Sequence, residues 1–282
     1  MKSLQRAARG VAGMLGTDSL LVRGARPMYE RTLALLSGGR GIAWEINGAP
    51  FRISPLHRLK MSAVYDPEVA RFLASSIRPG ATCLDVGANV GVYALQFARW
   101  TGERGRVVAF EPNPVSAAAL AEHVRMNGFE PRVEIVQAAV ADRPGTRVFH
   151  MADADGMSRL GAPNPELGDR TTPTTVRVTT VDEFCAERGI VPDWILIDVE
   201  GFELSVLAGA RRTLSAAGAR LNLIVEMHPD AWLVAGWSRA TAETLLEELG
   251  LEAVAVSGHA EALSAYGHVR LVPRSAAAGH RP

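Results

Sequence analysis

The sequence predicts an α/β domain with a doubly wound, mostly parallel sheet that ends in an antiparallel strand. Two observations support this fold class. From about residue 80 onward, apolar runs of strand length alternate with segments of helical periodicity. Several of these runs are apolar at every position, as strands covered by helices on both faces must be. The chain has 282 residues, 48% of them hydrophobic, which is enough for one large domain with a sizeable core.

The elements of the main sheet follow in order. Five apolar runs predict parallel strands: Thr82–Val86, Arg106–Phe110, Val133–Val136, Trp194–Ile197 and Leu221–Val225. Helical spacing predicts four helices: Gly91–Trp100, Val115–Met126, Glu203–Leu214 and Ala240–Leu249. The last two runs, Glu252–Val256 and His268–Pro273, are predicted to form an antiparallel pair that closes the sheet.

Two further strands are predicted outside this alternation, at Arg147–His150 and Thr175–Thr179. Between them, residues 151–174 carry three prolines and no periodicity, so they are predicted to be a lid or substrate-binding loop. Thr180 and Glu183 have the spacing of a capping box and predict the start of a short helix.

The predicted organisation has three parts. Residues 1–55 form a basic, helical cap segment, residues 56–273 form the main domain, and residues 274–282 form a disordered tail. The first forty residues contain seven Lys or Arg but only Asp18 and Glu30 as acids. A solvated cap helix packed on the domain is favoured for this segment. The alternative is a basic amphipathic helix that touches a membrane or a partner.

Composition excludes some functions. Lys and Arg balance Asp and Glu at 30 each, so no overall field attracts nucleic acid. No apolar run is long enough to be a transmembrane segment. Cys83 and Cys185 match no metal or redox spacing and are expected to be buried thiols in a reducing compartment, with the cytoplasm as the default location. The sequence leaves room for a homo-oligomer.

A glycine-rich turn predicts the cofactor site. Asp85-Val-Gly-Ala-Asn-Val-Gly91 lies where the first strand turns into the first helix. Gly87, Ala88, Asn89 and Gly91 would let the backbone approach a ligand at this point. Glu111, about twenty residues on and at the end of the next strand, can accept hydrogen bonds from both ribose hydroxyls of an adenosine.

The details of this turn favour S-adenosylmethionine over a dinucleotide. A dinucleotide fingerprint, G-x-G-x-x-G, admits a diphosphate to the helix N-terminus, whereas here Ala88-Asn89 replaces the second glycine. Asp85 would repel a diphosphate but suits the ammonium group of a methionine moiety. Asp142, after the third strand, is expected near the adenine amino group, although a surface turn explains it nearly as well.

These motifs resemble those of the FkbM-type methyltransferases. The matching stretches are Cys83-Leu-Asp-Val-Gly-Ala-Asn-Val-Gly-Val-Tyr93, Val108-Ala-Phe-Glu-Pro-Asn-Pro114, Ile195-Leu-Ile-Asp-Val-Glu-Gly-Phe-Glu203 with Val206-Leu-Ala-Gly209, and Ile224-Val-Glu-Met-His-Pro229. The resemblance covers residues 60–230. It implies the class I methyltransferase (Rossmann-like) fold, S-adenosyl-L-methionine as donor, and O-methylation of a small-molecule or glycan hydroxyl. By the same resemblance Asp85, Gly87, Asn89 and Glu111 fall at donor-binding positions. An NAD(P)-type oxidoreductase and a non-catalytic nucleotide-binding protein are the alternatives.

The catalytic residues are expected at the ends of two middle strands. Methyl transfer to an alcohol requires alignment of oxygen, carbon and sulfur and a base that removes the hydroxyl proton. Asp198 and Glu200 follow one apolar run, and Glu226 and His228 end the next one. Alternation in an extended segment places the two members of each pair on the same side.

Metal-free general-base catalysis is favoured over magnesium. Asp198 and Glu226 are the alternative metal ligands, since carboxylate oxygens suit a hard cation that would lower the hydroxyl pKa. Tyr65, Ser158 and Arg159 are the candidate acceptor contacts, in segments that could cover the donor site, although each is more often a surface or packing residue.

Overall fold

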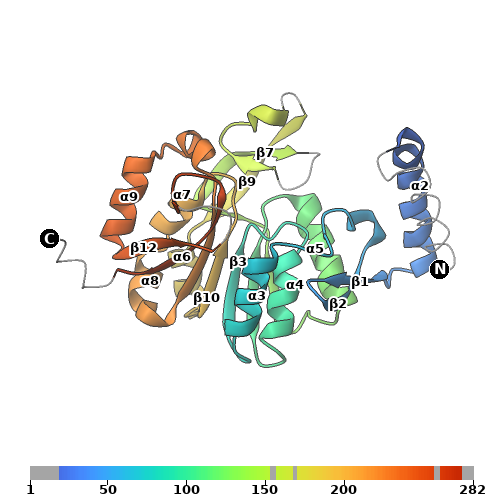
Figure 1. The fold of residues 1–282 in the computed structure, drawn as a ribbon, viewed down its shortest axis with the longest axis horizontal. Helices are drawn as coiled ribbons and strands as arrows, with labels where there is room; N and C mark the ends of the chain where they lie inside the picture. The colour runs from blue at the N-terminus through green and yellow to red at the C-terminus, as the bar shows by residue number, and fades with distance from the viewer. Residues whose placement is uncertain (1–18, 153–156, 168–169, 257–260, 275–282) are drawn as a thin grey trace.

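The computed structural model describes residues 19–152, 157–167, 170–256 and 261–274. Its centre is a seven-stranded sheet with helices on both faces (Figure 1). The strand order across the sheet is β12 (Leu251–Ala255), β13 (Gly267–Pro273), β11 (Asn222–Met227), β10 (Trp194–Ile197), β3 (Thr82–Val86), β4 (Arg106–Phe110) and β5 (Val133–Val136). Five neighbouring strands are parallel and β13 is antiparallel to both of its neighbours, which confirms the predicted fold class.

Alternate residues of each central strand enter two separate cores. In β3, Leu84 belongs to one core and Cys83 to the other. The first core packs under four helices, α6 (Val181–Arg188), α7 (Glu203–Ala208), α8 (Arg211–Ala217) and α9 (Arg239–Glu248). The second packs under three, α3 (Pro67–Ser76), α4 (Val92–Trp100) and α5 (Pro114–Met126). Both cysteines are free and buried, as expected.

The strand order reverses at the centre of the sheet. The chain passes from β3 to β4 and β5 on one side and then returns to β10 and β11 on the other. In open α/β sheets, ligands bind at such a switch point, outside the carboxyl ends of the strands. The ends of β3 and β10 are therefore the expected place for a site.

A small second sheet replaces part of the expected loop. Its order is β6 (Ala139–Val140), β9 (Thr171–Thr179), β7 (Gly145–Ala152) and β8 (Arg159–Leu160). The antiparallel ladder of β7 and β9 continues to the pair Ala152 and Thr171, so both strands enter the predicted 151–174 loop. This ladder extends the two strands beyond the bounds that the apolar pattern indicates. Residues 153–156 and 168–169 lie outside the described residues.

One predicted helix is two. The segment expected as Glu203–Leu214 breaks between α7 and α8, at Gly209 and Ala210. A Cβ on Gly209 would lie 2.1 Å from the carbonyl oxygen of Ala141, so only glycine allows this close approach of the two segments.

The N-terminal part contains a helix, in the segment expected to be helical, and a hairpin that the sequence did not predict. α2 (Leu20–Ser37) packs on the short helix η1 (Pro55–His57) at the edge of the molecule (Figure 1). Between them, β1 (Ile42–Ile46) and β2 (Ala49–Ile53) pair in an antiparallel hairpin. Residues 1–18 and 275–282 of the predicted terminal segments lie outside the described residues. Within the described ranges no helix is both long and apolar enough to span a bilayer.

Candidate active site

A cavity of about 330 Å³ opens at the switch point of the main sheet. It joins the glycine turn after β3 to the carboxylates after β10 and at the end of β11. Eleven of the predicted site residues line it: Tyr65, Asp85, Gly87, Ala88, Asn89, Glu111, Ser158, Arg159, Asp198, Glu200 and Glu226. The donor and acceptor halves predicted from separate motifs therefore face one space.

The glycine turn is held closely against the neighbouring strand end. Gly87 has φ 92°, and a Cβ there would lie 1.7 Å from the carbonyl oxygen of Asp198. The backbone N–H groups of Gly87 and Ala88 both donate to the carbonyl oxygen of Phe110. Any side chain at position 87 would push the two halves of the site apart.

Two buried carboxylates flank this turn. Glu111 accepts hydrogen bonds from the backbone N–H of Asn89 and of Asn113, both at 2.7 Å. Burial raises the pKa of Glu111 to about 7 against the opposing effect of these bonds. Each carboxylate oxygen has a second lone pair, so Glu111 can still accept two more hydrogen bonds.

Asp85 is the less satisfied of the two. It is buried, and its Oδ2 has no hydrogen-bond partner among the described residues. Burial and the nearby charge of Glu111 raise the pKa of Asp85 to about 7. An orphaned buried carboxylate oxygen is costly, and a cationic ligand would remove that cost. This supports an ammonium group as the ligand of Asp85.

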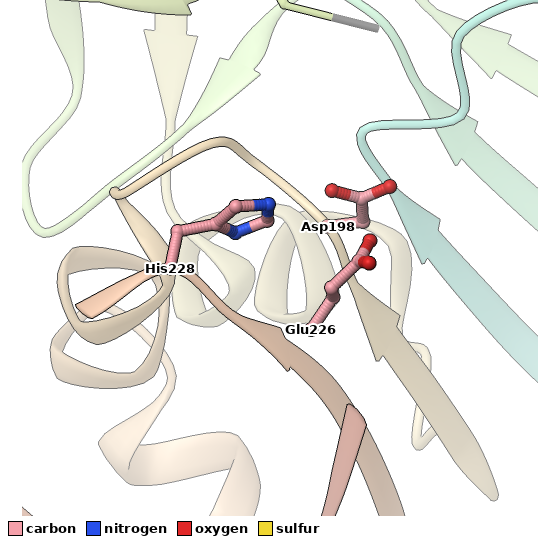
Figure 2. Close-up of side chains that lie close together, drawn as sticks. All are labelled: Asp198, Glu226 and His228. Carbon is pink, nitrogen blue, oxygen red and sulfur yellow. The ribbon is translucent and has the colours of Figure 1, made fainter. Parts of the chain in front are cut away.

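The acceptor half centres on two facing carboxyl groups. Figure 2 shows the carboxyl groups of Asp198 and Glu226 turned toward each other, with the ring of His228 beside them. Burial and the charges of Glu226 and Glu200 raise the pKa of Asp198 well above its usual value. The raised pKa of Asp198 favours its protonated form beside Glu226 when no cation is present.

The side chain of Glu203, which has no exposed surface, holds the ring of His228 in place. One oxygen of Glu203 lies 2.9 Å from Nδ1 of His228 and also accepts a hydrogen bond from the backbone N–H of Gly201 at 2.7 Å. The other oxygen accepts a hydrogen bond from Nε1–H of Trp232 at 3.0 Å. Burial alone would lower the pKa of His228, but the hydrogen bond and charge of Glu203, with Glu200 and Glu226, raise it to about 9. His228 is thus protonated at neutral pH, and it is not among the residues that line the cavity.

Glu200 differs from its neighbours in both backbone and charge. It has φ 52° although it is not glycine, a strained conformation that is often associated with functional sites. Burial raises the pKa of Glu200 to about 7, with His228 opposing this effect. A carboxylate with a pKa near 7 that faces a cavity matches the requirement for a general base at neutral pH.

A metal ion also fits these residues geometrically. Ligand atoms of Asp198, Glu226 and His228 lie within 4.8 Å of one another. Glu203 holds Nδ1 of His228, as the carboxylate partner of a metal-bound histidine does. A divalent cation would, however, have to displace protons from both His228 and Asp198.

Packing and hydrogen bonds hold the three predicted acceptor contacts in place. Tyr65 packs edge-on against Tyr93, with the ring centroids 5.6 Å apart. Ser158 accepts the Ala152 N–H at 2.9 Å and so fixes the end of β7. Arg159 is 5% exposed and donates to the carbonyl oxygens of Ala162 and Pro163, which orders the chain that follows β8. All three line the cavity.

Sequence reasoning missed a group of polar residues on the same wall. Asp66 accepts a hydrogen bond from Tyr93 Oη at 3.0 Å and lies 3.7 Å from Nε2 of His268. Tyr266 donates a hydrogen bond to Glu226. His268 faces Glu226 across the β11–β13 register. The antiparallel direction of β13 was predicted, and it implies that this strand begins beside the end of β11.

Two of the expected cofactor-binding residues do not line the cavity. Asp142 is not among the cavity residues, because its carboxylate pairs with Arg147 at 2.7 Å and with Arg143 at 3.0 Å. β6 pairs with β9 just before Asp142 and leads the chain away from the cavity. Gly91 also lies outside the lining. Its φ of 99° and its contact with Leu120, 2.4 Å from a Cβ placed there, assign it to helix packing.

Comparison with known proteins gives a consistent result. A family profile described as the methyltransferase FkbM domain matches residues 85–255. The 2-O-methyltransferase NoeI of Sinorhizobium fredii is 29% identical, with 49% of this chain and 60% of that protein covered. The 31-O-demethyl-FK506 methyltransferase FkbM of Streptomyces tacrolimicus is 34% identical, with 47% of this chain and 60% of that protein covered. The chain thus spans about 60% of the length of either relative. A methyltransferase FkbM of Methylobacillus flagellatus, of known structure, superposes with a TM-score of 0.46 at 16% identity, over 72% of this chain and 50% of that one.

Proposed function

The chain belongs to the FkbM methyltransferase family, and from this premise we propose that it transfers a methyl group from S-adenosylmethionine to a hydroxyl oxygen. One observation supports this proposal most directly. A glycine turn with two buried carboxylates opens into the same cavity as a second carboxylate cluster. The names of both relatives, NoeI and FkbM, also specify oxygen as the methylated atom.

The donor would lie along the ends of β3 and β4. Glu111 would accept the ribose hydroxyls with its two free lone pairs, and the backbone at Ala88 and Asn89 would pass close to the adenosine. Asp85 would pair with the ammonium group of the methionine moiety. The donor cation would restore the charge of Asp85, because a nearby positive charge lowers the pKa of a carboxyl group.

The acceptor would enter on the side of Asp198, Glu200 and Glu226. We assign the role of general base to Glu200, since it is the carboxylate with a pKa near 7 that faces the cavity. His228 carries a proton at neutral pH, so we assign it to positioning Glu200, 3.7 Å from its Nε2. In this proposal the base takes the hydroxyl proton while the oxygen attacks the methyl carbon in line with the departing sulfur.

We propose a small-molecule or glycan acceptor. Six carboxyl side chains line the cavity, Asp66, Asp85, Glu111, Asp198, Glu200 and Glu226, so hydrogen-bond acceptors dominate its wall. A sugar or polyol presents many hydroxyl donors to such a wall. An anionic acceptor would be repelled.

The test is a methyl-transfer assay with a donor labelled with ¹³C at the methyl group. The purified full chain is incubated with the donor and a panel of neutral sugars, polyols and macrolides, and the product is analysed by NMR. We expect a methyl ether to form at an unchanged rate in the presence of a chelator. If a chelator lowers the rate, a metal ion bound by Asp198 and Glu226, and not a general base, activates the hydroxyl. A methylated nitrogen or carbon would refute the oxygen assignment.

A further inference from the structure

Helix α2 exposes a broad apolar face. Five large apolar side chains on it are between 59% and 85% exposed: Leu20, Leu21, Met28, Leu35 and Leu36. Leu21, Met28 and Leu35 are spaced by seven residues, so they form one stripe along the helix. The opposite side of α2 is buried through Leu33, and Glu30 pairs there with Arg58 at 3.0 Å. The exposed stripe is therefore not the face that holds α2 on the domain.

A groove lined by arginines adjoins this face. Leu36 belongs to both, and the groove is lined by Leu36, Ser37, Arg40, Arg52, Arg125 and Met126. No carboxylate is among these lining residues of the described chain. Arg52 donates to the carbonyl oxygens of Arg40 and Gly41, and Arg125 donates to that of Gly39. These bonds fix the guanidinium groups and leave further N–H donors for an oxyanion.

The charge around this face is strongly one-sided. Of the first forty residues, those that the structure describes include Arg23, Arg26, Arg31 and Arg40 and one acid, Glu30, which is buried against Arg58. Because the chain as a whole is neutral, this positive segment is a local feature. A second copy of the chain would bring the same arginines into opposition, which disfavours a dimer through this face.

We propose that the apolar face of α2 and the adjoining arginine groove bind an anionic lipid bilayer. The stripe of Leu21, Met28 and Leu35 enters the boundary between headgroups and acyl chains, with α2 lying in the plane of the interface. Arg40 and Arg125 bind lipid phosphates beside it. The proposal takes up the amphipathic alternative that the sequence leaves open for this segment. The proposal does not depend on the methyl-transfer activity.

The test is co-sedimentation of the full chain with two kinds of vesicle, pure phosphatidylcholine and phosphatidylcholine mixed with phosphatidylglycerol. We expect binding to the mixed vesicles at least tenfold stronger than to the neutral ones, weakening as salt is raised. Met28→Glu with Leu35→Glu should weaken binding at least tenfold, and Arg40→Glu at least fivefold. The matched controls are Val191→Glu and Arg104→Glu, exposed positions in loops of the main domain, which should bind as the wild type does.

Three results would overturn the proposal. The first is a wild-type protein that does not bind the mixed vesicles. The second is a pair of α2 and groove variants that bind as tightly as their controls. The third is a wild-type protein that is a dimer in vesicle-free solution and becomes a monomer when Met28→Glu and Leu35→Glu are combined. The apolar face of α2 would then be the contact surface between two copies of the chain.

Discussion

Glu111 offers the sharpest test of the donor site, because its two roles can be separated. Its oxygens accept the backbone N–H groups of Asn89 and Asn113, and on the proposed function they also accept both ribose hydroxyls. The first role supports the turn and the second binds the ligand. Glu111→Ala removes both roles. Glu111→Gln keeps the shape but turns an amide N–H₂ toward one of the two backbone donors, so one of the supporting bonds is lost.

The magnitudes follow from the hydrogen bonds involved. Each hydrogen bond to a charged group contributes about 1.5–3 kcal/mol, so loss of even one ribose contact weakens binding at least tenfold, or about 1.4 kcal/mol. A buried N–H left without a partner costs about 1–3 kcal/mol of stability. We therefore expect Glu111→Ala to lower both the affinity for S-adenosylhomocysteine and the stability, and Glu111→Gln to lower the affinity less.

The assay is calorimetric titration of the full chain with S-adenosylhomocysteine, together with urea unfolding of each variant. Glu252→Ala, at an exposed position in edge strand β12, is the matched control and should change neither quantity. A folded Glu111→Ala protein that binds within threefold of the wild type would refute the assignment of Glu111 to the ribose. A folded wild type that does not bind at all would refute the donor itself.

Three further predictions concern the rest of the site. Since the pKa of Asp85 and of Glu111 is raised to about 7 in the free protein, ligand binding must displace protons below that pH, and we expect an affinity at least about tenfold lower at pH 6 than at pH 8 in the same titration. Glu200→Gln should lower kcat at least about a hundredfold, and a variant that retains activity would show that Glu200 is not the base. In the wild type, kcat/KM should rise with pH up to about 7 as Glu200 ionises. Gly87→Ala should destabilise the protein by at least about 2 kcal/mol in urea unfolding, whereas Gly80→Ala, at a similar φ of 90° with open space around it, should cost clearly less.

The donor half could be predicted from the sequence because its determinants are local. The turn from Asp85 to Gly91 follows an apolar strand directly, and Glu111 ends the next strand along the chain. Parallel neighbours in a doubly wound sheet bring such positions together without further information. Two of the expected residues, Asp142 and Gly91, do not line the cavity, for equally local reasons. The first is paired with arginines on the surface, and the second packs on Leu120.

The acceptor half could be predicted only in part because it depends on contacts between distant segments. Asp198 and Glu200 follow β10 and Glu226 lies at the end of β11, so the rule that indicates Glu111 indicates them too. Asp66 and Tyr266 reach the cavity from loops, and hydrophobic periodicity in the sequence does not predict the path of a loop. Whether His228 can act as a base depends on its contact with Glu203. From the sequence, Glu203 was predicted only to begin a helix.

Outside the site, pattern reasoning failed where strand pairing decided the structure. The β1–β2 hairpin has no long apolar run, yet its inward residues Ile42, Ile46, Phe51 and Ile53 all enter the second core. Likewise, β7 and β9 extend into a segment rich in proline because each supplies the other with a pairing edge. Such strands are stabilised by their partners, and neither partner alone indicates the pair.

The charges in the cavity give a reason why this arrangement suits methyl transfer. Six carboxyl groups and only two basic side chains, Lys60 and Arg159, line the described wall, so several carboxyl groups hold protons when no cation is present. A sulfonium donor would supply a positive charge next to Glu200 and thereby favour its ionised form. In the reaction the sulfonium becomes a neutral thioether while Glu200 takes up the hydroxyl proton, so both charges disappear together. Opposite charges that are removed in one step need no solvent to stabilise a separated pair. A buried, carboxylate-rich cavity is therefore suited to this reaction, and it would be a poor site for a reaction that creates a net negative charge.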